Sequence, residues 1–178
     1  MSKVLPSDYT FHHRTKTRWK DLDAFQHINN AVFVSYFEDA RIALFERWSL
    51  EPHGKSLIVA KVIVNYYKQL LHPSDFLIGQ KVSRVGNTSF DIQSTMFNTK
   101  DEVISDALIT CVCFDFDQQI KQPVYDLIKN DLNKWFIKNR YYFKKGVVLS
   151  NFESGDFSRE LADIIPLEEF KRNYLNNK

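Results

Sequence analysis

One stretch with helical spacing, set among several strand-like runs, most constrains how this chain can fold. Apolar and aromatic residues between Phe33 and Trp48 recur three and four positions apart, and charged residues fill the other positions. This spacing gathers the apolar side chains on one face, so it predicts an amphipathic helix of about five turns. Asn29 and Asn30 both stand where an N-cap belongs, and either side chain can accept a free N–H of the first turn.

Strand-like runs surround this helix. We expect a half-exposed first strand within residues 11–19 and further strands at 57–67, 75–85, 89–98 and 103–116. The 89–98 run alternates apolar and polar residues, which predicts one buried and one solvated face. The 103–116 run is apolar on both faces, which predicts a central position. Because short turns join the last runs, we expect an antiparallel meander, and the whole pattern predicts an α+β domain with a helix on one face of a curved sheet.

The length of 178 residues suits one domain. We place this domain at about residues 5–123. After Pro123 the apolar residues again recur at helical spacing, and Pro166 stands where a last short helix would open. Residues 124–178 are therefore predicted to form a helical C-terminal extension packed on the domain, without a domain of their own.

Composition narrows the classes of function. The 24 basic and 22 acidic residues give a net charge of +2, which is too small to predict nucleic-acid binding. No apolar run approaches the roughly 20 residues that cross a bilayer, and the first ten residues lack a signal-peptide pattern. We therefore expect a cytoplasmic protein without a membrane partner.

Neither the cysteines nor the histidines suggest a metal site. Cys111 and Cys113 would lie on the same side of a strand, too close in sequence for an ordinary disulfide and too few for zinc. His12 and His13 would point to opposite faces of a strand. We predict free, buried thiols and neither a metal nor a cofactor.

Polar groups crowd the segment 21–30, between the first strand and the helix. It holds two carboxylates, one imidazole and two amides at a helix start. A helix N-terminus offers unpaired N–H groups and the positive end of a dipole, which stabilise an oxyanion. A nearby carboxylate can attack a carbonyl carbon or draw a proton from water. The segment therefore contains both groups that cleavage of a thioester requires.

The same segment belongs to a longer motif, Arg18-Trp19-x-Asp21-x-Asp23-x-x-x-His27-Ile28-Asn29-Asn30, continued by Tyr36-Phe37-Glu38-x-Ala40-Arg41. This motif resembles the signature of the hotdog-fold 4-hydroxybenzoyl-CoA thioesterase-like family, with local similarity to acyl-carrier-protein thioesterases. The resemblance continues through Tyr66 and Pro73 to residues 86–90 and 115–123, about two-thirds of the chain. It implies a curved antiparallel sheet wrapped around a long central helix, in dimers or tetramers with active sites at the subunit interface.

The resemblance also implies roles for individual residues. Asp23 falls on the catalytic carboxylate, acting either as nucleophile or as general base, and the amide that polarises the thioester carbonyl falls at Asn30. His27 is a third candidate for the chemistry. Two positions depart from related proteins: Gln26 stands where many members have glycine, and Phe25 stands where carrier-protein thioesterases have asparagine.

Five residues are candidates for substrate binding. We expect Phe25 to line an apolar acyl groove, and aromatic residues of the helix to touch the acyl chain. Ser89 has no nucleophile-elbow spacing, so we expect a polar contact from it rather than a serine nucleophile. The complete set of substrate-binding candidates is Phe25, Tyr36, Tyr66, Thr88 and Ser89.

Each polar residue of the motif also has a structural interpretation. Asp23 can cap a turn or pair with Arg18, Asp21 can fix the loop, and His27 can be a hydrogen-bonded imidazole that holds it. The favoured function is nevertheless hydrolysis of acyl-CoA, or of an acyl-carrier protein, in lipid metabolism. Two alternatives stay open: a hotdog protein that binds acyl thioesters without hydrolysis, and an adaptor that binds nucleic acid or protein through the basic, aromatic segment 138–145.

Overall fold

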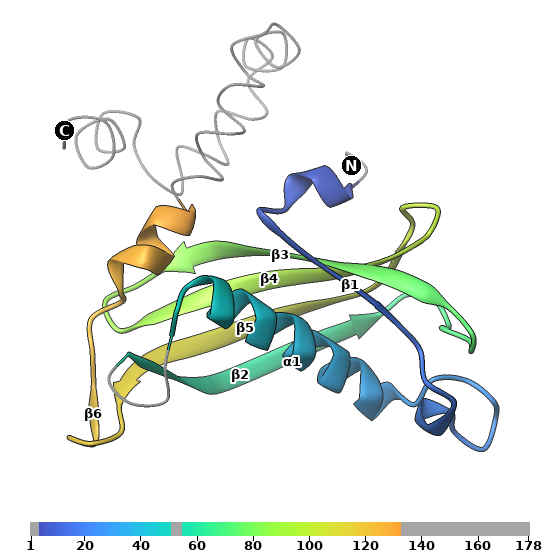
Figure 1. Ribbon diagram of the computed structural model, residues 1–178, viewed down its shortest axis with the longest axis horizontal. Coiled ribbons are helices and arrows are strands. Elements are labelled where there is room, and N and C mark those ends of the chain that lie inside the picture. Colours follow the sequence, from blue (N-terminus) through green and yellow to red (C-terminus); the bar gives the residue numbers. More distant parts are fainter. Residues whose placement is uncertain (1–3, 51–54, 133–178) are drawn as a thin grey trace, which may run out of the picture. The chain divides into compact units, whose positions relative to one another are not determined.

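The computed structural model describes residues 4–50 and 55–132 (Figure 1). These residues belong to one compact unit, which reaches Leu132. The predicted extension is described only at its start, where residues 126–132 are helical. Its remainder, 133–178, lies outside the described residues, and so does the segment 138–145. In the part that is described, no helix combines the length and apolar character needed to cross a bilayer.

The elements follow the predicted order of strand, helix and strands. In chain order they are η1 (Pro6–Asp8), β1 (Phe11–Lys16), η2 (Trp19–Asp21), α1 (Asn30–Arg47), β2 (Ser56–Tyr66), β3 (Asp75–Val85), β4 (Ser89–Asn98), β5 (Val103–Asp115) and β6 (Ile120–Lys121). The α+β prediction is therefore confirmed. Strands β3 and β4 have the bounds that the sequence predicted, because their hydrophobic patterns end at clear turn residues.

All strand pairs are antiparallel, and the main sheet runs in the order β1-β3-β4-β5-β2. Strands β3, β4 and β5 form the expected meander, and β5 is central as predicted. Strand β2 stands outside this meander, because it pairs with β5 rather than with β3, the next strand in the chain. The two edges of the sheet are therefore β1, on one side, and β2, on the other.

Helix α1 lies across one face of this curved sheet (Figure 1). Asn29 is its N-cap: the side-chain oxygen accepts a hydrogen bond from the N–H of Ala31 at 2.9 Å. The ring of Phe33 meets that of Tyr66 on β2 edge to face, at 5.3 Å between centroids. The face turned to the sheet carries the buried residues Phe33, Phe37, Ala40 and Leu44.

Strand β4 departs from the predicted alternation because both of its faces are buried. The polar residue Thr95 is only 3% exposed. Tyr9, which precedes β1, covers this second face: its hydroxyl shares a hydrogen bond with Thr95 and its ring packs edge to face on Phe97. The close approach needs Gly79 beneath the ring, since a Cβ there would lie 2.7 Å from a ring carbon of Tyr9.

The two cysteines are free and buried, as the sequence predicted. Both lie on central strand β5. Burial raises the pKa of the Cys111 thiol to about 12 and also raises the pKa of Cys113. Both thiols therefore stay protonated near neutral pH and serve as small apolar side chains in the core.

An ion pair between the solvent-accessible Arg47 and the buried Asp131 ties the C-terminal end of α1 to the start of the extension. The Arg47 guanidinium donates to the carboxylate of Asp131, which is 2% exposed, and to the carbonyl oxygen of Thr10 at 3.0 Å. Arg47 also lies over the ring of Phe11 at 5.2 Å. One side chain thus joins α1, β1 and the helical segment 126–132.

Candidate active site

The polar segment between β1 and α1 forms a closed loop. Leu22 and Ile28 form an isolated antiparallel bridge. Inside it, the Asp23 N–H donates to the His27 carbonyl at 2.8 Å, and the Gln26 N–H donates to the Asp23 carbonyl at 3.1 Å. These bonds fix the backbone on both sides of Asp23, so the side chain leaves from a defined position just before the helix.

The two oxygens of Asp23 have different environments. Oδ1 accepts hydrogen bonds from the N–H groups of Phe25 and His27, at 2.8 and 3.1 Å. Oδ2 accepts none from any described residue. The turn-capping interpretation is therefore right for one oxygen, while the other remains available to a ligand. The alternative pairing with Arg18 does not occur, because Arg18 bonds to Asp21 instead.

The start of α1 supplies an N–H donor that bonds to none of the described residues. Asn29 uses its side chain on the Ala31 N–H, and its carbonyl oxygen accepts from the Val32 N–H at 2.9 Å. The Asn30 N–H donates to none of the residues that the structure describes. The Tyr66 hydroxyl donates to the Asn30 carbonyl at 3.0 Å and so anchors β2 to the first turn of the helix. A carboxylate oxygen and a free helix-start N–H thus leave the same short loop.

Asp21 holds this loop in place. Its carboxylate accepts from Arg18 Nε at 2.8 Å and from the Tyr36 hydroxyl at 2.5 Å, and its carbonyl accepts from the Asn29 N–H at 3.0 Å. Burial disfavours the charge, but the hydrogen bonds from Arg18 and Tyr36 outweigh burial and hold the pKa of Asp21 below its usual value. Asp21 therefore has the loop-fixing role that the sequence suggested.

A second loop, residues 67–74, lies behind the first. The Leu70 carbonyl accepts from the Ile28 N–H at 2.9 Å, and the rings of Trp19 and His72 pack edge to face with centroids 6.0 Å apart. Sequence reasoning missed this support. The only signal was the break at His72-Pro73, which marks a loop without showing which segment it touches.

The remaining candidates fall in three different places. Phe25 is 81% exposed on the loop itself, and the His27 ring makes no hydrogen bond to a described residue. Tyr36 is buried behind the loop with its hydroxyl on Asp21. Thr88 and Ser89 lie at the start of β4, whereas Tyr66 and the start of α1 lie at the other end of the sheet. A single chain therefore brings together Asp23, Phe25, His27, Asn30 and Tyr66, but not Thr88 and Ser89.

Gln26 adopts the left-handed backbone conformation, with φ of 62°. Glycine reaches this region without the clash that a Cβ causes. We predict that Gln26→Gly raises the unfolding free energy by about 0.5 kcal/mol, since relief of the strain slightly exceeds the added entropy of the unfolded chain. Urea unfolding measures the change, with Gln26→Ala as a control that keeps the strain. A destabilised Gln26→Gly variant would contradict this assignment.

Over the described residues, no group of three or more histidine, cysteine, aspartate or glutamate side chains is arranged to hold a metal ion. The site therefore offers a carboxylate, a helix-start N–H and an adjacent imidazole as its chemical groups. That set suits attack on an acyl carbon with stabilisation of the oxyanion.

Comparisons with known proteins agree with this description. The family model of the thioesterase-like superfamily matches residues 17–144. The long-chain acyl-CoA thioesterase FadM of Escherichia coli (strain K12) is 28% identical over 110 residues, which cover 58% of this chain and 83% of FadM.

Solved structures show the same fold. A thioesterase from Thermus thermophilus, crystallised with coenzyme A and zinc, is 25% identical with a TM-score of 0.62, over 72% of this chain and 95% of that one. A 1,4-dihydroxy-2-naphthoyl-CoA thioesterase from Synechocystis, 11% identical, shares the fold alone with a TM-score of 0.61, over 68% and 94% of the two chains. The hotdog fold implied by the motif is thereby confirmed, and the chain belongs to the thioesterase-like superfamily.

Proposed function

We propose that this protein hydrolyses acyl-CoA thioesters at the junction between the 22–28 loop and α1. The observation that carries the proposal is that one short loop holds two groups without a hydrogen-bond partner among the described residues, the Oδ2 of Asp23 and the N–H of Asn30. The similarity to FadM, named as a long-chain acyl-CoA thioesterase, supports coenzyme A as the carrier. An acyl-carrier protein is the alternative carrier, with the same chemistry at the thioester.

The chemistry follows from these two groups. The thioester carbonyl oxygen accepts a hydrogen bond from the Asn30 N–H, and the positive end of the α1 dipole favours the charge that develops there. Asp23 either takes a proton from water, whose oxygen attacks the acyl carbon, or attacks that carbon itself to form an anhydride that water then opens. In both routes the C–S bond breaks, the thiolate takes a proton, and a carboxylic acid is released.

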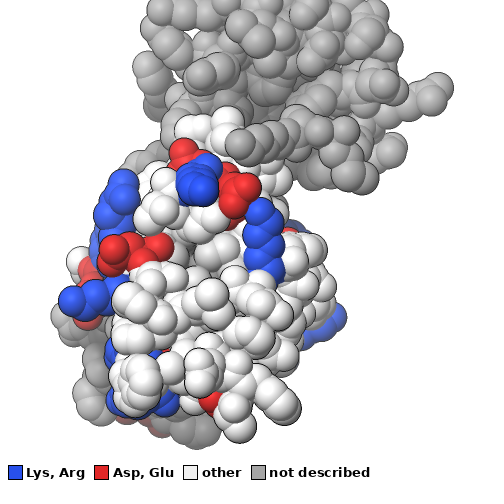
Figure 2. Space-filling view, turned by 90° about the vertical axis from the view of Figure 1, so that its right-hand side faces the viewer, with Lys and Arg blue, Asp and Glu red and all other residues white. Residues whose placement is uncertain are grey.

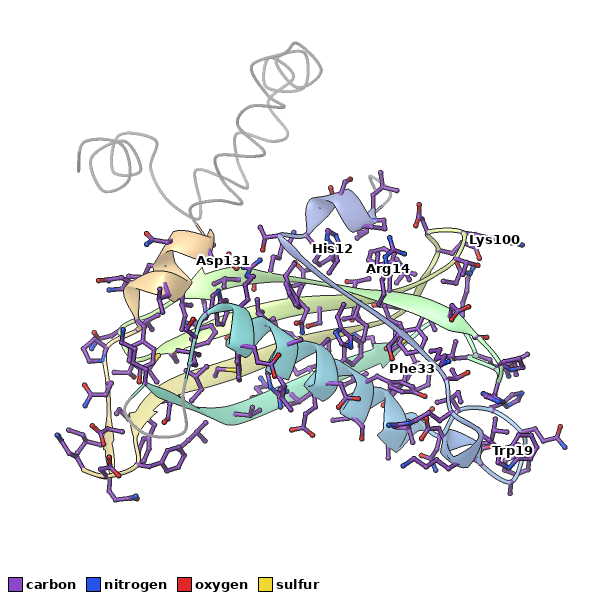
Figure 3. The ribbon with its side chains drawn as sticks, viewed as in Figure 1. His12, Arg14, Trp19, Phe33, Lys100 and Asp131 are labelled. Atoms are coloured by element: carbon purple, nitrogen blue, oxygen red, sulfur yellow. The ribbon has the colours of Figure 1, made fainter. Side chains whose placement is uncertain are left out.

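A second copy of the chain would complete this site. Strand β2 is a long sheet edge whose outer side pairs with no described strand, and it exposes Ile58, Val59, Val62 and Ile63 by 36–40% each. Such an edge is normally covered. The opposite edge, β1, is shorter and exposes His12, Arg14 and Lys16, whose charge and polarity discourage strand addition (Figure 3). We therefore place the subunit contact at β2.

Pairing of two β2 strands about a two-fold axis is antiparallel, so the start of one strand lies beside the end of the other. Within one chain, Ser89 and Tyr66 are opposite Val112 and Ser105 of β5, which separates them by roughly 23 Å. The two-fold arrangement brings the partner's Thr88 and Ser89 toward this chain's Tyr66 and Asn30. That arrangement would place the predicted Thr88 and Ser89 contacts at a shared site.

A charge on the β2 edge tests this arrangement. We predict that Val62→Lys raises the dimer dissociation constant roughly a hundredfold, because the edge would bury an unpaired ammonium group. Light scattering should show a dimer for the wild type and a monomer for the variant, and hydrolysis should fall with the dimer. Ile120→Lys, on exposed β6, is the matched control and should remain dimeric. A dimeric Val62→Lys would place the contact elsewhere.

The proposed function is tested by following thiol release from acyl-CoAs of graded chain length and from an aryl-CoA. The proposal expects catalysed release from at least one of them. If the protein binds these compounds but releases no thiol from them or from acylated carrier protein, it is a binding protein rather than a hydrolase.

A further inference from the structure

We infer that the end of the described unit around Trp19 docks on the surface of a lipid bilayer. Trp19 is 77% exposed on η2, and Leu71 is 51% exposed on the 67–74 loop. Figure 3 shows Trp19 at the right-hand end of the described unit, where η2 and the loop that follows it lie. Exposed apolar groups gathered at one place mark an interaction surface.

The two side chains form one tip because their loops touch. Trp19 packs on His72, the neighbour of Leu71 in sequence, and the Ile28 N–H bonds to the Leu70 carbonyl. Phe25, 81% exposed, lies on the first of these loops. We leave it out of the docking surface because the proposed function assigns it to the acyl chain. Large apolar side chains that protrude from adjacent loops suit insertion among lipid headgroups, where tryptophan is favoured.

The charges around this tip nearly cancel. Lys16 and Lys20 flank Trp19 in sequence, are exposed, and make no ion pair with any residue that the structure describes. Arg18 neutralises the buried Asp21. Asp75, opposite Lys16 in the β1–β3 register, and Asp23, on the 22–28 loop, offset the two lysines. Figure 2, which faces this end, shows its lower part as mainly uncharged surface. The tip is thus apolar with a rim whose charges nearly balance, so insertion of the apolar side chains rather than electrostatic attraction would hold it on the bilayer.

We predicted no membrane partner because the sequence lacks an apolar segment long enough to cross a bilayer. Docking on the bilayer surface does not need such a segment. The inference rests on the proposed function in one respect: a long-chain acyl thioester is an amphiphile that partitions into bilayers. The tip lies beside the Asp23 loop, so docking would present the site to substrate held in the membrane.

Co-sedimentation with vesicles of phosphatidylcholine and phosphatidylglycerol tests the inference. The wild type should pellet with the vesicles, and Trp19→Ala/Leu71→Ala should reduce the partition coefficient onto vesicles by roughly tenfold or more. Phe116→Ala/Ile120→Ala removes two comparably exposed apolar side chains, 46% and 47%, from the β5–β6 region, and should bind like the wild type. A wild type that stays in solution, or equal loss in both double variants, would overturn the inference.

Two further measurements separate other occupants of this surface. Light scattering should show the same mass for Trp19→Ala/Leu71→Ala as for the wild type; a change to monomer would make the tip a subunit contact instead. Binding of purified acyl-carrier protein, lost in the same variant while vesicles fail to bind, would make it a protein-docking surface.

Activity assays keep this inference separate from the proposed function. Hydrolysis of a soluble short-chain acyl-CoA should be unchanged in Trp19→Ala/Leu71→Ala, while hydrolysis of long-chain substrate on vesicles should fall. A wild type that binds vesicles without hydrolysing any thioester would refute the proposed function and leave the docking intact.

Discussion

Asp23→Asn should lower kcat for thioester hydrolysis by roughly a thousandfold while KM changes little. An amide neither takes a proton from water nor attacks an acyl carbon, so both routes open to the carboxylate are lost. The variant's side-chain oxygen can still accept from the N–H groups of Phe25 and His27, so the loop should keep its shape. Thiol release at saturating substrate measures the effect, and a loss of only a few-fold would contradict a chemical role.

The neighbouring carboxylate provides a matched control. Asp21→Asn makes the same chemical change two residues earlier, where the carboxylate is buried and accepts from Arg18 and Tyr36. We expect Asp21→Asn to lower the unfolding free energy by about 2 kcal/mol, since charged hydrogen bonds are weakened. Asp23→Asn should leave it nearly unchanged. The two variants thereby separate a group that holds the loop from one that acts on substrate.

Arg47→Met should lower the unfolding free energy by about 3 kcal/mol, the second large effect that we predict. Methionine keeps much of the aliphatic packing over Phe11 but leaves the Asp131 carboxylate buried, at 2% exposure, without its cation. Urea unfolding followed by circular dichroism measures the change. A loss below about 1 kcal/mol would mean that solvent reaches Asp131 and that the ion pair contributes little.

The double variant Arg47→Met/Asp131→Asn tests the reason for that loss. If the orphaned carboxylate is the cause, removing its charge should restore part of the stability, so the double variant should exceed Arg47→Met alone. If the double variant is less stable than Arg47→Met alone, the loss of stability would come mainly from lost packing rather than from the buried charge.

The sequence predicted the local elements well because their signals are local. The spacing from Phe33 to Trp48 is enough for a helix, and turn residues bound β3 and β4. The features that the sequence did not predict depend on contacts between residues that are far apart in the chain. The second face of β4 is buried because Tyr9 lies across Gly79 and Thr95. No residue near β4 in the sequence indicates that Tyr9 packs there. The pairing of β2 with β5 could not be predicted either, because several strands have similar hydrophobic patterns and any of them could pair with β2.

The candidate site divides in the same way. Asp23, His27 and Asn30 stand on one continuous segment, so a motif of fixed spacing could locate them together. Within the described part of the chain, the Oδ2 of Asp23 and the N–H of Asn30 have no hydrogen-bond partner. This could not be predicted, because it depends on which N–H groups bond to the Asn29 side chain and to Oδ1 of Asp23. Thr88 and Ser89 were placed by resemblance alone, and in one chain they lie at the far end of the sheet from Asn30.

Whether Asp23 acts on the substrate or only caps a turn is decided by a paired measurement of turnover and binding. Turnover of an acyl-CoA and calorimetric binding of its non-hydrolysable thioether analogue are measured on wild type and Asp23→Asn. If Asp23 carries the chemistry, both proteins bind the analogue with equal affinity and only the wild type turns over the acyl-CoA. Parallel loss of binding and turnover, or full turnover by Asp23→Asn, would contradict it and return Asp23 to a structural role.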